Sequence, residues 1–98
     1  MIKIFKSVDK KLEEIGFRKQ YDKNDIVHYI RDVSYPCKYR QAVVIIHKDN
    51  GETILQSYDV NLGDDKGIGN ICVGLTYYEL KLLIKKMKLK GWNNAIKN

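Results

Sequence analysis

The stretch from Leu75 to Trp92, LTYYELKLLIKKMKLKGW, constrains the fold more than any other part of the chain, because it carries signals for the start and the end of one helix. Thr76 is followed three residues later by Glu79, a spacing that predicts a capping box at the helix start. Gly91 predicts the left-handed residue that ends a helix, after which Trp92 packs against the last turn. The sequence therefore predicts a helix of several turns near the end of the chain.

Two faces are expected on this helix. Apolar side chains at spacings of three and four are expected to face a core: Leu80, Leu83, Ile84 and Met87. Lysines line another face: Lys81, Lys85 and Lys88. Residues 75–98 carry six basic and one acidic side chain, whereas residues 1–74 carry 12 basic and 11 acidic ones. The positive charge is thus concentrated on the final helix and tail, where it favours either an anionic partner or simply a solvated face.

The rest of the chain predicts one helix followed by strands. A helix is expected from Ile4 or Ser7 to Ile15, ended by Gly16. Segments of strand composition follow, with the last as a short edge strand: Phe17–Tyr21, Ile26–Val33, Tyr39–Lys48, Glu52–Val60 and Ile71–Val73. This order predicts an α+β fold, in which an antiparallel sheet of about four strands has the N-terminal and C-terminal helices on one face (α-β-β-β-β-α). We expect a single domain over residues 1–92, with 93–98 as a short polar tail.

The turn Asn50-Gly51 predicts a tight type I′ hairpin between the third and fourth strands. That turn places Ile46 opposite Leu55 and Val43 opposite Tyr58, whereas a bulged turn shifts the register. In the tight register one sheet face carries Ala42, Val44, Ile46 and Leu55. The other face carries Val43, Ile45, Ile54, Tyr58 and Val60. Because both faces are apolar and the helices cover only one, the second face is expected to be partly bare.

The residue types of catalytic and metal sites are present without the spacing that such sites need. Cys37 and Cys72 are expected to be free thiols that pack as small buried side chains. With His28 and His47 they are the types that bind zinc, but no Cys-x-x-Cys or His-x-x-x-His pair occurs. No feature of the sequence lowers a thiol pKa or pairs two carboxylates for acid–base chemistry. The sequence predicts no enzyme activity, no catalytic residue, no metal site and no cofactor.

Two loop patterns also fall short of a known site. Gly67-Ile68-Gly69 precedes a helix but lacks the third glycine and the parallel strand pair of a dinucleotide site. The oxygen-bearing side chains nearby do not match the spacing of a calcium loop and are interpreted as turn residues: Asp59, Asn61, Asp64 and Asp65. No stretch has the length of a membrane span, and the N-terminus MIKIFKSVDKK lacks the apolar core of a signal peptide. We therefore expect a cytoplasmic protein with no membrane partner.

Nucleic-acid binding is the first functional hypothesis, because phosphates require clustered cations. The clustered cations are Lys81, Lys85, Lys86, Lys88 and Lys90. Single strands also require aromatic rings on which bases stack. Tyr29, Tyr39 and Tyr58 are candidates for such a platform on the uncovered sheet face.

Protein binding is the alternative hypothesis. A two-faced sheet can bury its bare face against a host protein or a second copy of the chain. The residues expected at this interface are Tyr29, Val43, Ile45 and Tyr58. The two hypotheses predict different responses to salt, because phosphate contacts weaken steeply as salt rises and apolar contacts do not.

The chain resembles small uncharacterised proteins encoded by phages and prophages of Gram-positive bacteria. The resemblance lies in the segment FKSVDKKLEEIGF, Phe5 to Phe17, and in the ending Val73 to Trp92, with its Gly-Leu-Thr-Tyr-Tyr-Glu-Leu-Lys and Lys-Gly-Trp sequences. It covers both expected helices and most of the chain. It implies an accessory role in the host cytoplasm, as a binder of host proteins or of nucleic acid, and it carries over no catalytic residue.

Overall fold

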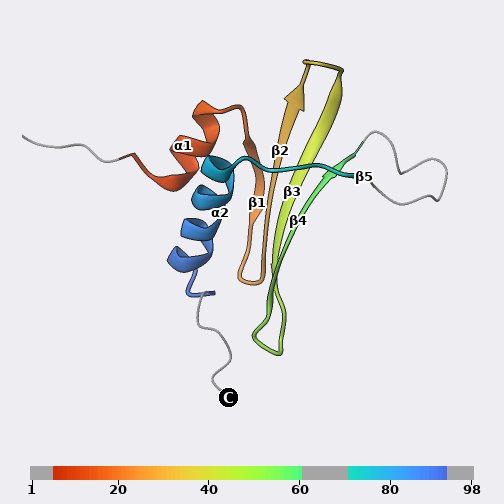
Figure 1. The fold of residues 1–98 in the computed structure, drawn as a ribbon. Coiled ribbons are helices and arrows are strands. Elements are labelled where there is room, and N and C mark those ends of the chain that lie inside the picture. Colours follow the sequence, from red (N-terminus) through yellow and green to blue (C-terminus); the bar gives the residue numbers. More distant parts are fainter. Residues whose placement is uncertain (1–5, 61–70, 93–98) are drawn as a thin grey trace, which may run out of the picture.

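The computed structural model describes residues 6–60 and 71–92, which form an antiparallel sheet with two helices on one of its faces (Figure 1). The elements in chain order are α1 (Val8–Glu14), β1 (Arg18–Asp22), β2 (Ile26–Val33), β3 (Tyr39–His47), β4 (Thr53–Asp59), β5 (Ile71–Cys72) and α2 (Tyr77–Leu89). The strands lie in the sheet in the same order as in the chain, and each pairs with its neighbour in antiparallel fashion. The predicted α+β architecture is confirmed, with the short β5 at one edge.

Both helices end in the same way, as their glycines predict. In α1, the side chain of Ser7 caps the first turn, and Gly16 takes a φ of +101° after the last turn. The backbone N–H of Phe17 then donates to the carbonyl of Leu12, and that of Gly16 donates to Glu13. This pair of hydrogen bonds is a Schellman motif, and it directs the ring of Phe17 into the core.

The ends of α2 follow the predicted signals. Thr76 and Glu79 form the capping box, since each side chain accepts a hydrogen bond from the backbone N–H of the other residue. At the far end Gly91 has a φ of +78°, and the backbone N–H of Trp92 donates to the carbonyl of Met87. Trp92 is buried as a result, in the same way as Phe17 after α1.

The predicted core-facing side of α2 is confirmed for Leu83, which is buried, and for Met87, which packs against the core, but it is wrong for the other two residues. The buried side chains of α2 are Glu79, Leu82, Leu83 and Lys86. Leu80 and Ile84, which were expected in the core, are 36% and 40% exposed. One residue corresponds to about 100° around a helix, so the helix is rotated by roughly that angle from the predicted orientation. The physical reason is that two charged side chains of α2 have partners on the sheet and on α1, so the apolar pattern alone does not set the orientation.

The core lies between the helices and one face of the sheet. It consists of Val8, Leu12, Phe17, Val27, Tyr29, Val43, Ile45, Leu82, Leu83 and Trp92. Tyr29 pairs directly with Val43, and Val27 pairs with Ile45, so these four side chains share the face that the helices cover. The predicted interface residues Tyr29, Val43 and Ile45 are therefore core residues, and their assignment to an uncovered face was wrong.

The hairpin between β3 and β4 has the bulged turn, so the predicted tight register is wrong. Three residues, 49–51, form the loop, and Gly51 has a φ of +93° while Asn50 does not have a positive φ. A type I turn followed by a glycine bulge has this conformation, whereas a type I′ turn requires positive φ at both central residues. Ile46 consequently lies opposite Ile54 rather than Leu55.

The shifted register exchanges the two faces of β4. Leu55 now lies opposite Ile45 and packs against the core, on the face covered by the helices. Ile54 and Tyr58 lie on the opposite face, where Tyr58 pairs with Ala42. We call this second side of the sheet the open face.

Some sequence expectations lie outside the described residues: the start of the first helix at Ile4, the glycine-rich connection over 61–70 and the tail over 93–98. Within the described residues, no helix has the length and apolar character needed to cross a membrane.

Candidate functional site

The five lysines predicted to bind nucleic acid fall into two sets that point in opposite directions. At 100° per residue, Lys86 and Lys90 lie on the side of α2 that faces the sheet, together with Leu82 and Leu83. The other lysines lie on the outer side: Lys81, Lys85 and Lys88. The sequence predicts that all five form one basic cluster, but in the structure they form an inward pair and an outward row.

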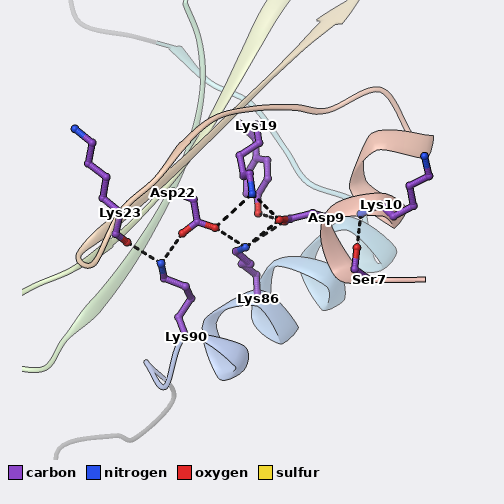
Figure 2. A network of polar contacts seen from close by, with 9 residues as sticks. Ser7, Asp9, Lys10, Lys19, Asp22, Lys23, Lys86 and Lys90 are labelled. Carbon is purple, nitrogen blue, oxygen red and sulfur yellow. Dashed lines mark hydrogen bonds and ion pairs between the residues drawn. The ribbon is translucent and has the colours of Figure 1, made fainter. Parts of the chain in front are cut away.

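The inward pair belongs to a partly buried ionic cluster that joins α2 to α1 and β1 (Figure 2). Lys86 is only 8% exposed, and its ammonium lies 2.7 Å from one oxygen of Asp22 and 3.2 Å from both oxygens of Asp9. Lys90 donates to the second oxygen of Asp22, and Lys19 forms ion pairs with both aspartates. We call these five residues the lysine–aspartate cluster.

Electrostatics within this cluster keeps both aspartates ionised. Burial alone would raise the pKa of Asp22, but the hydrogen bonds and charges of Lys86 and Lys90 outweigh it and lower the pKa to about 2. The pKa of Asp9 is also lowered, since hydrogen bonds from Tyr29, Lys19 and Lys86 outweigh the effect of its burial. Burial and the hydrogen bond to Asp9 raise the pKa of the Tyr29 hydroxyl, so this group remains a donor.

A second buried ion pair orients the start of α2. Arg31 on β2 donates to Glu79 at 2.7 Å, and the same guanidinium donates to the side chain of Gln41 and to the carbonyl of Ile15. The pKa of Glu79 is lowered, because the hydrogen bonds from Thr76 and Arg31 outweigh its burial. The pair therefore joins β2 and the end of α1 to the first turn of α2.

The outward side of α2 carries the candidate functional site. Its residues lie within about 100° of one another around the helix and opposite the buried side chains. We call this set the outer stripe: Tyr77, Lys81, Ile84, Lys85 and Lys88. Four of them, all except Tyr77, line a shallow hollow of about 330 Å³ on the helix surface.

The charges of the outer stripe are not neutralised by neighbours. In the described part of the chain, no acidic side chain forms an ion pair with Lys81, Lys85 or Lys88. The single acidic residue after Leu75 is Glu79, and it is buried against Arg31. The stripe is therefore positive from Lys81 to Lys88.

Tyr77 was not predicted as a site residue. Its side chain is 76% exposed, and the ammonium of Lys81 lies 5.2 Å from the centroid of its ring. The spacing of four residues between Tyr77 and Lys81 is the signal that could have placed both on one helix face. Conversely, the predicted contributions of Lys86 and Lys90 to a basic face are corrected, because both side chains are occupied by the lysine–aspartate cluster.

The predicted tyrosine platform does not form. Tyr29 is in the core, and Tyr39 lies on the same side of the sheet by strand alternation, whereas Tyr58 lies on the open face. Of the four predicted interface residues, only Tyr58 lies on the open face. The most exposed apolar side chains there are Tyr21 and Ile54, at 39% and 38%.

The histidines and cysteines are not brought together. His28 lies on the open face, with its Nε2 atom buried and without a hydrogen-bond partner, and burial lowers its pKa. His47 stacks on Trp92. Cys37 and Cys72 are free thiols as predicted, but both are exposed rather than buried. Within the described residues, no group of His, Cys, Asp and Glu side chains is arranged to hold a metal ion.

Comparisons with protein families, curated proteins and solved structures found no match. The function of this chain is therefore inferred from its own geometry.

Proposed function

We propose that this protein is a non-enzymatic accessory protein that associates with nucleic acid through the outer stripe of α2. The observation that carries this proposal is the row of three exposed lysines that has no acidic side chain on its own helix face. A nucleic-acid backbone supplies a row of negative charges, and lysines bind phosphates as point charges without fixed geometry. The resemblance to small phage and prophage proteins fits an accessory role of this kind in the cytoplasm.

A lipid surface is a poorer partner for this helix. Amphipathic helices that lie on membranes bury a broad apolar face between the acyl chains. In α2 the outermost side carries three lysines around a single isoleucine, Ile84, while Leu80 and Leu89 lie on opposite flanks of the stripe. The apolar side chains are thus too dispersed to form one lipid-facing surface.

The proposal predicts weak, salt-sensitive binding. Three phosphate contacts give a slope of about −2 in a plot of log affinity against log salt for a single strand. The affinity should therefore fall about 20-fold between about 50 mM and about 200 mM salt. Fluorescence anisotropy of a labelled oligonucleotide measures this change directly.

A charge-matched pair of variants tests which lysines are responsible. Replacing Lys81, Lys85 and Lys88 by glutamine is expected to abolish binding at low salt. Replacing three exposed lysines on other elements, Lys10, Lys23 and Lys38, removes the same charge and is expected to change affinity far less. Equal losses in both variants, or no binding of the parent protein at low salt, contradict the proposal. Binding to anionic vesicles but not to nucleic acid also contradicts it.

The open sheet face supports a second candidate function, protein binding. The observation that favours it is the pair of exposed apolar side chains, Tyr21 and Ile54, on the side of the sheet that no described helix covers. For self-association, sedimentation equilibrium should show concentration-dependent dimers that persist at high salt. Ile54→Lys should shift these dimers to monomers, whereas the lysine variants of α2 should not. If the protein remains monomeric at the highest concentration tested, self-association is excluded. Capture of a host protein by the parent but not by Ile54→Lys supports binding of a host protein through the open face.

A further inference from the structure

We propose that the outer stripe selects single-stranded over double-stranded nucleic acid, because Tyr77 provides a stacking surface for one unpaired base. This inference rests on the proposed function and names the class of nucleic acid. It depends on three observations: the exposure of Tyr77, its alignment with the lysines, and the residue types that α2 lacks.

Tyr77 is placed to stack a base at one end of the lysine row. Lys81 lies over the ring, and a ring that is 76% exposed still offers a face to a ligand. A cation on one face of an aromatic ring and a base on the other are compatible, since bases stack on aromatic side chains through their π-faces. Neighbouring Tyr78 is also exposed, but it lies about 100° away from Tyr77 around the helix, at the margin of the stripe.

The lysines continue in line from Tyr77 along the helix. From Tyr77 to Lys88 the helix rises about 16 Å at 1.5 Å per residue. Stacked nucleotides rise about 3.4 Å each along a duplex axis, and an unstacked strand is more extended, so this length corresponds to at most about five nucleotides of one strand. A single strand can thus place one base on Tyr77 and its following phosphates beside Lys81, Lys85 and Lys88, with the apolar side chain of Ile84 beneath the sugars or bases.

A duplex cannot use the whole stripe. Its bases are paired and stacked on one another, so Tyr77 has no base to stack without unstacking the helix. Base pairs are read in the major groove mainly by arginine, lysine, asparagine and glutamine, and of these α2 contains only lysine, which also binds phosphates as a point charge. The duplex is therefore limited to the three lysine contacts, and the stripe should have little sequence preference on either substrate.

The test compares one sequence as a single strand and as a duplex, in the parent protein and in variants of the two adjacent tyrosines. We expect the parent to bind the single strand at least about 5-fold more tightly than the duplex of the same sequence. Tyr77→Ala should remove this preference while leaving duplex affinity within about 2-fold, and Tyr77→Phe should retain it. Tyr78→Ala, the matched control, should keep the preference within about 2-fold. A bromouracil-containing single strand should photo-cross-link to the peptide that holds Tyr77, a readout that needs no variant.

The outcomes separate this inference from the proposed function. Equal affinity for both forms, with no effect of Tyr77→Ala, overturns the single-strand inference but leaves association through the lysines intact. Absence of binding to either form overturns the proposed function itself. Loss of the preference in Tyr78→Ala but not in Tyr77→Ala contradicts the assignment of the stacking residue. Unchanged circular dichroism and thermal midpoint for each variant show that a loss of binding does not come from unfolding.

Discussion

Lys85 and Lys86 are adjacent in the sequence, yet they have different roles in the folded protein. Lys86 is buried between Asp9 and Asp22, whereas Lys85 lies in the outer stripe. Composition and net charge cannot distinguish the two, because the distinction depends on carboxylates that are more than 60 residues away in the sequence. The sequence therefore locates the charge, and only the tertiary structure shows which part of it is available to a partner.

Replacing Lys86 by methionine should destabilise the fold, because two carboxylates lose the cation between them. Lys19 and Lys90 remain nearby, so we expect a loss of about 1–3 kcal/mol in the free energy of unfolding rather than the full cost of breaking a buried pair. Lys85→Met is the matched control and should change stability by less than about 0.5 kcal/mol. Denaturant titration of both variants measures the difference. Equal stability of the two contradicts a structural role for Lys86.

The lysine–aspartate cluster also predicts a loss of stability in acid. The folded-state pKa of Asp22 is about 2, below its ordinary value of 3.8, and that of Asp9 is lowered too. A carboxyl group with a lowered pKa stabilises the fold above its unfolded-state pKa, and this contribution disappears as pH falls through the folded-state value. Denaturant titrations between about pH 5 and about pH 2 should thus show decreasing stability.

Asp22→Asn tests the assignment of this pH dependence. The variant should be less stable than the parent at neutral pH, and the difference should shrink as the pH is lowered toward about 2. Asp25→Asn, at an exposed turn of the same hairpin, controls for loss of a carboxylate. A stability difference between the parent and Asp22→Asn that is constant over this range would contradict the account.

At the scale of elements, local signals in the sequence place the ends of helices and strands well. The predicted strand Ile26–Val33 matches β2 at both ends, and both glycine stops have the expected positive φ. The errors concern how elements face one another. Asn50-Gly51 is compatible with both a tight and a bulged turn, and the choice between them shifts every partner of β4 by one residue. The rotation of α2 has a different origin, because Glu79 and Lys86 form ion pairs with side chains of other elements that the helix sequence does not reveal.

The two glycine stops should be sensitive to alanine substitution. Alanine at Gly16 or Gly91 must adopt a left-handed conformation, which we expect to reduce the free energy of unfolding by about 1–2 kcal/mol. The effect should be larger at Gly16, where an added Cβ would lie 3.2 Å from a side-chain carbon of Arg31, whereas no atom lies within 4 Å at Gly91.

Gly74→Ala provides the comparison for these two variants. Gly74 does not have a positive φ, and an added Cβ there meets no atom within 4 Å. Its substitution should be neutral or slightly stabilising, because alanine restricts the unfolded chain more than glycine does. Thermal unfolding measures the midpoints of the three variants. A lower midpoint for Gly74→Ala than for the other two would contradict the assignment of the helix stops.

At the scale of the whole molecule, the two helices cover one face of the sheet and leave two surfaces for partners. One is the open sheet face, and the other is the outer side of α2. The overall α+β order follows from the sequence, because periodicity and caps are local properties. The identity of the bare face does not, because it depends on which side of the sheet the helices pack against, and the register of one turn then decides which side chains of β4 lie on it. The outer stripe is partly predictable, since three of its lysines were expected and Tyr77 follows from helical spacing.

The salt dependence of binding to a single-stranded oligonucleotide tests the central claim most directly, because its slope counts phosphate contacts. The parent protein should give a slope of log affinity against log salt of about −2. Lys85→Gln should bring this slope closer to zero by about 0.7, and Lys23→Gln, an exposed lysine on the β1–β2 turn, should leave it unchanged. Equal slopes for the parent and Lys85→Gln, or a change in Lys23→Gln alone, would contradict the assignment of the outer stripe as the nucleic-acid contact.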